Sequence, residues 1–388
     1  MNKKDIAGIR RQLKVDNDLL KISDIFNVYI MKETTDIYHH QSQPFEMLDK
    51  DQQELFINNF KKLLTGQLNE KLFELKFKRE ADNQSQLILH KGLLSSQVED
   101  WKEEMLRMTE KMIKDHPYEK DVVITFIRAE YLKPMKRRNE EAEESERDAV
   151  YSHPFILCSI NKTQESKKEL VFDYIEKEFK YNIDVDSVID LDAPMTGFLF
   201  PCFTNQASDV NHVLYAAGKA NEPDPRFIEE VLNGEHTITA KEDKAVFEEV
   251  IKDVIGDQLT PSTLANVYRE INHVVEENEE EEEPKLDYKN VERVLNQSGE
   301  KVDSEKVKAA FQRITDDESY ELKASSIVPK YKSKSIKINT KIANVSISPQ
   351  DLEYVRQVNY KGKRCIMIEV EEDAEIDGFK LLPEAFGE

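Results

Sequence analysis

Residues 195–219, MTGFLFPCFTNQASDVNHVLYAAGK, hold side chains that could form a nucleophilic site. Cys202 supplies a thiol, and Asp209 and His212 stand three residues apart, so they are neighbours if the segment is helical. A histidine that takes the proton of a thiol, and is itself held by a carboxylate, can activate cysteine for attack on a substrate. The sequence therefore offers a hypothesis of a Cys-His-Asp catalytic site at these three positions.

The same stretch also fits a buried core element. It contains one acid and one base, Asp209 and Lys219, in a chain of which 34% is charged. Strict alternation along FLFPCF places Phe198, Phe200 and Cys202 on one apolar face of a strand. Apolar surroundings raise the pKa of a thiol and make it unreactive. NQASD then supplies caps for a turn before a short helix or strand, so the catalytic and the core interpretations both stay open.

Motifs of familiar enzyme chemistry are missing from the sequence. It contains no GxGxxG fingerprint, no P-loop, no HExxH and no GxSxG. The eight histidines do not stand at metal-ligand spacings with the cysteines. We therefore expect no metal and no cofactor, and a protein that acts by binding. A metal-dependent hydrolase or nuclease stays as an alternative, supported only by the abundance of Asp and Glu.

Hydrophobic periodicity predicts an α+β protein that begins with a strand-rich domain over residues 1–221. Helices are expected at 5–14, 49–66 and 97–115, the second with Asp49 as N-cap and with Leu55 on its inward face. The third has a stripe of Trp and Met that we interpret as core. Strand composition is seen in DIFNVYIMK, TDIYHH, DVVITFIRAEYL, PFILCSIN, ELVFDYIE and GFLFPCF. Residues 133–148 are expected to form an exposed hairpin tip or a docking loop.

Two further regions follow the strand-rich domain. Residues 222–319 show helical periodicity in DPRFIEEVL, KEDKAVFEEVIKDVIG, PSTLANVYREINHVVEE, YKNVERVLNQSG and DSEKVKAAFQRITD. This helical middle is interrupted by ENEEEEEP, a like-charge run that cannot pack. The helices of this region could supply a homodimer interface. Residues 320–388 are expected to form a small α+β module, in which SIKINTK, NVSIS and KRCIMIEVE flank the short helix SPQDLEYVRQ.

The charge balance restricts the kinds of partner. Among 388 residues, 55 Lys and Arg face 77 Asp and Glu, for a net charge of -22. Such a surface opposes nonspecific attraction to phosphate backbones and to anionic membranes. Three separated cysteines suit a reducing compartment, and no run approaches the roughly 20 apolar residues of a membrane span. These features predict a cytoplasmic protein without a membrane partner.

One segment reverses the acidic trend. Residues 320–364 contain ten bases and three acids, and KASSIVPKYKSKSIKINTK alone holds six lysines and no acid. In SIKINTK, alternation turns Ile336 and Ile338 inward and Lys337, Asn339 and Lys341 outward. Lysine, serine and tyrosine side chains are usual contacts to phosphate oxygens. The predicted nucleic-acid-binding residues are Lys330, Lys332, Lys334, Lys337 and Lys341. The alternative is a lysine-protected strand edge.

Two stretches resemble a known family. The opening MNKKDIAGIRRQLKVDND and the segment GFLFPCFTNQASDVNHVLYAA resemble a bacterial family known as domain of unknown function 4317, which implies no particular activity. The order of elements, ending in KIANVSISPQDLEYVRQVNYKGKRCIMIEV, is also similar to the nucleoid-associated protein family. That second resemblance implies association with the nucleoid or with nucleic acid, at the level of fold analogy.

Three hypotheses of function follow from these observations. The first is a non-enzymatic cytoplasmic protein, in the nucleoid if the second resemblance holds, that binds nucleic acid through the C-terminal lysines. The second is an acidic regulator that imitates the phosphate array of DNA and binds a basic, nucleic-acid-binding protein. The third is the metal-dependent hydrolase or nuclease. Recovery of partners with and without nuclease treatment distinguishes the first two.

Overall fold

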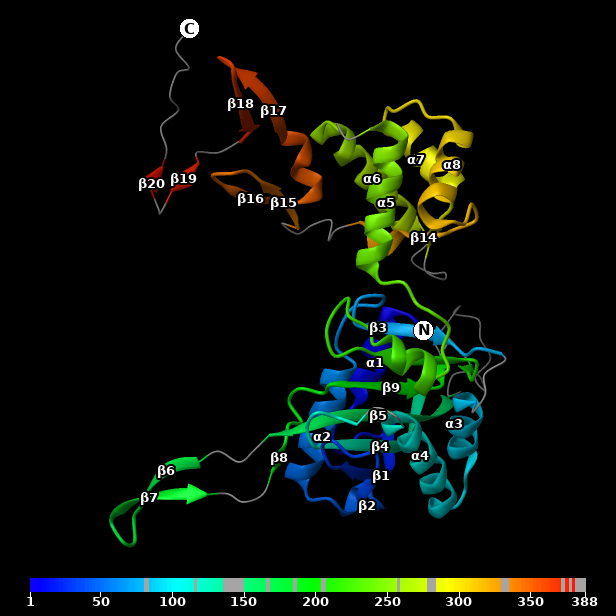
Figure 1. Ribbon diagram of the computed structural model, residues 1–388, viewed down its shortest axis with the longest axis vertical. Coiled ribbons are helices and arrows are strands. Elements are labelled where there is room, and N and C mark those ends of the chain that lie inside the picture. The colour runs from blue at the N-terminus through cyan, green and yellow to red at the C-terminus, as the bar shows by residue number, and fades with distance from the viewer. Residues whose placement is uncertain are drawn as a thin grey trace, which may run out of the picture. The chain divides into compact units, whose positions relative to one another are not determined.

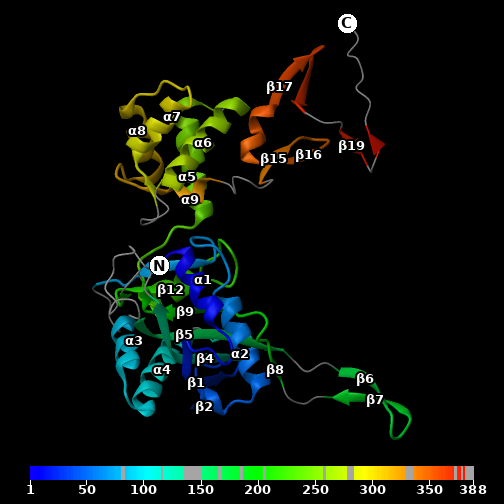
Figure 2. The same ribbon diagram turned by 180° about the vertical axis from the view of Figure 1, so that it is seen from behind.

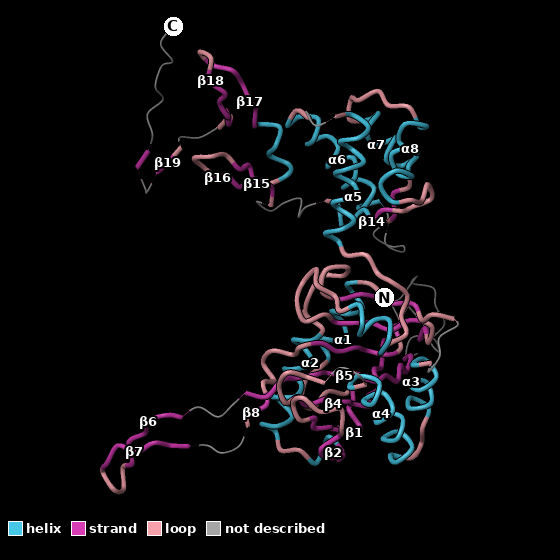
Figure 3. Tube along the Cα trace, in the orientation of Figure 1, coloured by secondary structure: helices cyan, strands magenta, loops and turns pink. Residues whose placement is uncertain are grey.

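The computed structural model of the protein forms two compact units, Met1–Thr239 and Ala240–Glu388 (Figure 1). It describes residues 1–79, 84–114, 117–134, 150–164, 168–183, 187–203, 207–256, 259–277, 284–328, 335–370, 374–376 and 379–380. Helices and strands occur in both units, so the α+β class predicted from the sequence is confirmed (Figure 3).

The first unit is built on one antiparallel sheet with the strand order β2-β1-β4-β5-β9-β12-β3, and β8 pairs with β5. Every pair of neighbours in this sheet runs antiparallel. The strands are β1 (Leu20–Ile30), β2 (Ile37–Pro44), β3 (Leu72–Lys76), β4 (Val122–Pro134), β5 (Val150–Gln164), β8 (Val188–Ile189), β9 (Thr196–Phe200) and β12 (His212–Ala216). The sequence patterns located most of these strands, but β3 and the two-residue strand β8 were not recognised.

Helices cover both faces of this sheet (Figures 1 and 2). One face packs against α1 (Lys3–Gln12) and α2 (Lys50–Leu63), and the other against α3 (Ser85–Leu94), α4 (Val98–Ile113) and the π-helical turn η3 (Phe227–Val231). Alternation along β5 serves both layers: Ile156 and Cys158 face α3 and α4, while Phe155 and Leu157 face α1 and α2. A short 3-10 turn, η1 (Phe45–Met47), precedes α2.

The start of α2 follows the prediction from its sequence. Asp49 accepts a hydrogen bond from the Gln52 N–H at 2.8 Å, and the Gln52 side chain accepts one from the Asp49 N–H at 3.3 Å. This capping box confirms Asp49 as the N-cap. The prediction that Leu55 faces inward is wrong, because its side chain is 53% exposed. The buried face of the helix follows Ile57 and Phe60, which places Leu55 on the opposite side.

The Trp and Met stripe of α4 is core, as predicted. Trp101, Met105, Met108 and Met112 are all fully buried against the sheet. The guanidinium of Arg128, from β4, lies 5.5 Å from the centre of the Trp101 ring. This packing fixes α4 on the sheet.

Two parts of the first unit differ from their predicted roles. The expected strand ELVFDYIE ends early: β6 (Lys168–Asp173) turns into β7 (Glu178–Ile183), and within the described residues these two strands pair only with each other. The segment DPRFIEEVL, predicted as part of the helical middle, forms η3 and contributes Phe227, Ile228 and Val231 to the core of the first unit.

The second unit begins with the predicted helices. These are α5 (Ala240–Ile255), α6 (Pro261–Glu277), α7 (Tyr288–Gln297) and α8 (Ser304–Thr315), followed by the single turn α9 (Ala324–Ile327). They enclose a separate apolar core with the two-residue strands β13 (Lys285–Leu286) and β14 (Leu322–Lys323). The Thr263 N–H donates to Thr260 Oγ1 at 3.1 Å, which supports Thr260 as the cap before Pro261. Most of the Glu run lies outside the described residues.

Small antiparallel hairpins complete the chain. β15 (Ile336–Asn339) pairs with β16 (Asn344–Ile347), and β17 (Val355–Tyr360) pairs with β18 (Lys363–Ile368). The 3-10 helix η4 (Pro349–Tyr354) joins the two hairpins. A last pair, β19 (Glu375–Ile376) and β20 (Phe379–Lys380), follows. The three expected C-terminal strands are therefore present. The expected helix SPQDLEYVRQ is a 3-10 helix over Pro349–Tyr354, and its last residues instead begin the strand β17.

Candidate functional site

The hairpin β15–β16 presents one apolar and one polar face. Cross-strand pairing aligns Ile336 with Ile347 and Lys337 with Ser346. Ile336, Ile338 and Ile347 pack on Leu264, Ala265, Leu352 and Val355, which belong to α6, η4 and β17. This contact holds the hairpin to the helical part of the second unit.

The polar face of β15–β16 is open to solvent. Lys337, Asn339, Asn344 and Ser346 are all exposed and belong to cross-strand pairs of the same face. Lys341 is exposed at the tip, which is closed by a hydrogen bond from the Thr340 N–H to the Ala343 carbonyl at 2.9 Å. The resulting surface combines two ammonium groups with amide and hydroxyl groups, the types of side chain that contact phosphate oxygens.

The second hairpin is a two-stranded ribbon with a basic end. Lys361 and Gly362 both have positive φ, 48° and 76°, as a two-residue turn of type I′ requires. The Lys361 ammonium lies 5.4 Å from the centre of the Tyr360 ring. Lys363 and Arg364 begin the returning strand and are exposed. The ribbon therefore carries three bases and an aromatic ring at its tip.

Neither hairpin contains an acidic residue. Residues 335–348 hold two lysines and residues 355–368 hold four bases, in a chain with 77 acids. Asp351 and Glu353 lie between the hairpins on η4, and Glu353 forms an ion pair with Arg269 of α6 at 3.1 Å. We call residues 335–348 and 355–368 the basic hairpins. Each of them carries exposed bases, on a protein whose net charge is -22.

The predicted lysine cluster is only partly described. Lys330, Lys332 and Lys334 lie outside the described residues. Lys337 and Lys341 are exposed on the first basic hairpin, with Lys337 outward and its neighbours Ile336 and Ile338 inward, as alternation predicts. The sequence count of bases included Lys361, Lys363 and Arg364, but nothing in the sequence pattern indicated that they share one ribbon tip.

The second candidate site predicted from the sequence, the Cys-His-Asp group, lies in the first unit, and its cysteine, Cys202, is buried. The residue is on β10 (Cys202–Phe203), which pairs with β11 (Ser208–Asp209). Its side chain is 0% exposed, and burial raises the pKa of its thiol well above the usual value, with the Glu74 carboxylate adding to the effect. The prediction that it shares a face with Phe198 and Phe200 is wrong: the chain turns at Pro201, and Cys202 packs in the opposite layer.

Asp209 and His212 do interact, although not on a helix. Asp209 ends β11 and His212 begins β12, and the His212 Nδ1 lies 2.6 Å from Asp209 Oδ2 across the turn. Partial burial acts to raise the pKa of Asp209, but hydrogen bonds from the Asn211 N–H and from His212 outweigh it and keep that pKa below its usual value. Cys202 faces Asp209 as its backbone partner, so the three residues are close in the fold, but the thiol is buried and poorly ionised.

A polar network in the first unit was not recognised from the sequence. The Lys111 ammonium donates to Ser85 Oγ at 2.5 Å and to Asn233 Oδ1 at 2.6 Å. Burial lowers the pKa of Lys111 to about 8, and the charge of Lys114 adds to this. Asn233 has a left-handed backbone, with φ of 54°, and stands two residues after the end of the π-helical turn. A lysine inside an amphipathic helix gave no sequence signal of this network.

Two kinds of feature are absent from the described part of the chain. Among these residues, no group of three or more His, Cys, Asp or Glu is placed to hold a metal ion. In the same part of the chain, no helix has both the length and the apolar character that a membrane span needs.

Comparison with known proteins identifies a family. The model of a family described as a domain of unknown function, DUF4317, matches residues 1–379. No curated protein and no solved structure matches the chain. The resemblance in element order to the nucleoid-associated protein family is not shown by these comparisons.

Proposed function

Since the chain belongs to the DUF4317 family, whose description assigns no activity, we propose a function from the site itself: the C-terminal module binds nucleic acid through the basic hairpins. The observation that carries this proposal is their charge. The two hairpins carry six exposed bases and no acidic residue, although the protein as a whole is strongly acidic. Exposed bases on segments that contain no acid are what an electrostatic contact to phosphates requires.

The shape of the second basic hairpin favours duplex DNA as the partner. A two-stranded ribbon fits the major groove of B-DNA, which is about 12 Å wide. Within such a groove, Lys363 and Arg364 at the tip reach phosphates or base edges, and Lys337 and Lys341 of the first hairpin reach the backbone. The acidic residues on the rest of the protein reduce nonspecific binding to DNA, because their negative charge repels the duplex.

The direct test is DNA binding by the full chain and by a charge-reversal variant. The variant carries Lys337→Glu, Lys341→Glu, Lys363→Glu and Arg364→Glu, all at exposed positions. We expect the wild type to bind a short duplex in a gel shift or an anisotropy titration at low salt, and the variant to lose that binding. A control with Lys252→Glu and Lys301→Glu, which are exposed on the helical part of the same unit, should bind as the wild type does. Absence of binding by the wild type at low salt would refute the proposal.

The acidic-mimic alternative is separated by recovery of partners from a lysate. If the chain binds nucleic acid, nuclease treatment removes the proteins that it recovers. If its acidic surface binds a basic protein directly, recovery survives nuclease and also survives the charge-reversal substitutions. The alternative of a metal-dependent enzyme gains no support from the described residues, which contain no metal-binding cluster.

A further inference from the structure

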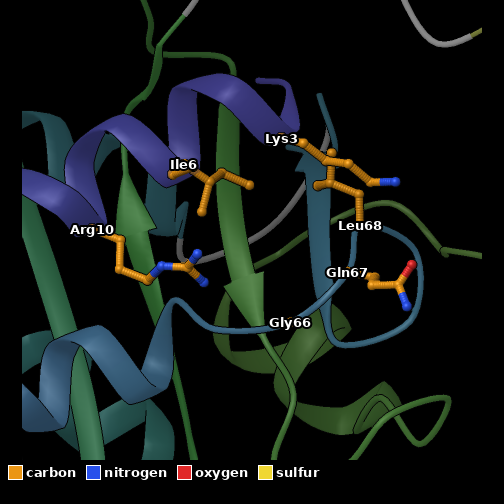
Figure 4. A pocket seen from close by; sticks show the side chains of 7 residues that line it. Lys3, Ile6, Arg10, Gly66, Gln67 and Leu68 are labelled. Atoms are coloured by element: carbon orange, nitrogen blue, oxygen red, sulfur yellow. The ribbon is translucent and has the colours of Figure 1, made fainter.

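A hollow of about 340 Å³ lies between α1 and the loop that follows α2 (Figure 4). This volume is at the lower end of the range of about 300 to 1,000 Å³ seen for small-molecule sites. The walls come from residues 3–10 of the helix and residues 66–68 of the loop. The hollow is therefore formed within the first unit, by elements far from the basic hairpins in sequence.

The hollow is lined by apolar residues and by two cations. Ile6 and Leu68 supply apolar lining, and Figure 4 shows Leu68 beside Lys3. Lys3 and Arg10 are seven residues apart on α1, which is about two helical turns, so both belong to one face of the helix. Figure 4 shows Arg10 at one end and Lys3 at the other, with Ile6 between them on the helix.

No carboxylate lines the hollow. Within the described part of the chain, neither Lys3 nor Arg10 takes part in an ion pair, and the Arg10 Nη1 lies 3.4 Å from the Thr65 hydroxyl. The acid of α1 that is nearest in sequence, Asp5, accepts a hydrogen bond from the Asn2 N–H at 3.1 Å in the capping box. The two cations therefore face a hollow that provides hydrogen-bond donors without a competing anion.

The loop is held in one shape by its own backbone. Gly66 has φ of 156°, and a Cβ at this position would lie 2.7 Å from the Lys71 Cβ, so only glycine fits without a shift of the chain. The N–H groups of Lys71 and Leu72 donate to the Gln67 carbonyl at 3.0 and 3.1 Å. The loop wall is thus formed before any ligand binds, which reduces the entropy cost of binding.

We infer that this hollow binds a small phosphate monoester, with the phosphate at the Arg10 end and the apolar part of the molecule against Ile6 and Leu68. Guanidinium pairs with phosphate through parallel N–H bonds. The Thr65 hydroxyl accepts from Arg10 and donates its own proton to the Lys61 carbonyl at 2.6 Å, so it helps to place the guanidinium and does not itself donate to the ligand. At the far end, the Lys3 ammonium and the Gln67 amide can donate hydrogen bonds to a second polar group, and the Lys3 charge adds to the positive field. We prefer a phosphate to a carboxylate as the ligand group. The three terminal oxygens of a phosphate can accept hydrogen bonds from more of the guanidinium, ammonium and amide donors than the two oxygens of a carboxylate can.

The test is a titration of the full chain with phenyl phosphate, with inorganic phosphate, benzoate and phenol as comparison probes at constant ionic strength. Binding is followed by isothermal calorimetry and by amide NMR shifts of residues 3–10 and 66–68. We expect saturable binding of phenyl phosphate, weaker binding of inorganic phosphate and of benzoate, and none of phenol. Each comparison probe lacks one of the two features that the hollow recognises.

Two charge-matched variants decide whether the hollow itself is responsible. Lys3→Glu with Arg10→Glu should raise the Kd for phenyl phosphate by at least about tenfold, because both cations of the hollow are reversed. Lys4→Glu with Arg11→Glu makes the same change of charge on the same helix at exposed positions outside the hollow, and should leave the Kd nearly unchanged. Equal losses in the two variants, or no saturable binding by the wild type, would overturn the inference.

Discussion

The ammonium group of Lys111 lies 2.5 Å from the hydroxyl of Ser85, although the two residues belong to different helices. Ser85 is fully buried at the start of α3 and also lies 2.6 Å from the Val231 carbonyl. Asn233 completes the arrangement by accepting from Lys111 and from the Ser85 N–H. These contacts join α3, α4 and the segment after η3, so a single lysine connects three parts of the first unit.

The Lys111→Met variant should change how stability depends on pH. Burial lowers the pKa of Lys111 to about 8 in the folded chain, from 10.5 for an ordinary lysine. Between these pH values the unfolded chain binds more protons at this position than the folded chain, so the wild type gains stability relative to the variant as pH rises from 8 toward 10.5. Unfolding in denaturant can be followed by the fluorescence of Trp101, the one tryptophan, which packs in this unit.

Lys91→Met is the control for that comparison. Lys91 is exposed on α3, so this control removes a lysine ammonium that is not buried. A difference between wild type and Lys111→Met that stays flat with pH would show that the Lys111 ammonium is not desolvated in solution.

The cysteines should differ in reactivity toward a thiol reagent. Cys158 and Cys202 are fully buried, and burial raises the pKa of both thiols, so little of the reactive thiolate forms. Cys365 is partly exposed on β18. Titration of the native chain with a chromogenic disulfide should therefore detect one fast thiol, and Cys365→Ser should remove it.

The catalytic hypothesis for Cys202 has its own decisive result. Rapid labelling of Cys202 in the native chain would contradict its burial and would revive a nucleophilic role with His212. Cys202→Ala should instead lower stability by about 1 kcal/mol, as expected for removal of one buried apolar atom from a packed core.

Gly197→Ala should destabilise the first unit strongly. A Cβ on Gly197 would lie 2.1 Å from the Cys158 carbonyl oxygen, in the neighbouring strand, and 2.9 Å from Leu63 of α2. The clash with backbone cannot be relieved by a rotamer change, so we expect a loss of about 3 kcal/mol or more in the free energy of unfolding. Gly8→Ala on α1 is the matched control: its Cβ would meet only the Tyr131 hydroxyl at 3.4 Å, and the higher helix propensity of alanine should leave stability equal or higher.

The sequence predicted those elements whose periodicity is set by burial on one face. The sequence predicts the helices α2 and α4 because apolar residues repeat at helical spacing along both, including Phe60 in α2 and Trp101 in α4. The strand β3 and the helix α3 were missed, because a five-residue strand and a helix that is apolar on most sides give weak periodic signals. The DPRFIEEVL segment was assigned to the helical middle, since no local pattern reveals which core its apolar residues join.

The candidate sites show the same limit. Exposure of Lys337 followed from alternation along one strand, which is local information. The inward turn of Cys202 to the opposite layer depends on how the chain turns at Pro201, and the meeting of Lys111 with Ser85 depends on tertiary packing of two helices. Contacts of this kind join residues far apart in sequence, so composition and periodicity contain no record of them.

The salt dependence of DNA binding should divide between the two basic hairpins. Each phosphate contact that is lost reduces the slope of log K against log salt by about 0.9, because fewer counterions are released from the duplex. Lys337→Glu with Lys341→Glu on the first hairpin, and Lys363→Glu with Arg364→Glu on the second, should each lower the slope. Anisotropy titrations at several salt concentrations give these slopes. If only the ribbon substitutions change the slope, the first hairpin does not contact phosphate, and Lys337 and Lys341 instead protect a strand edge from association.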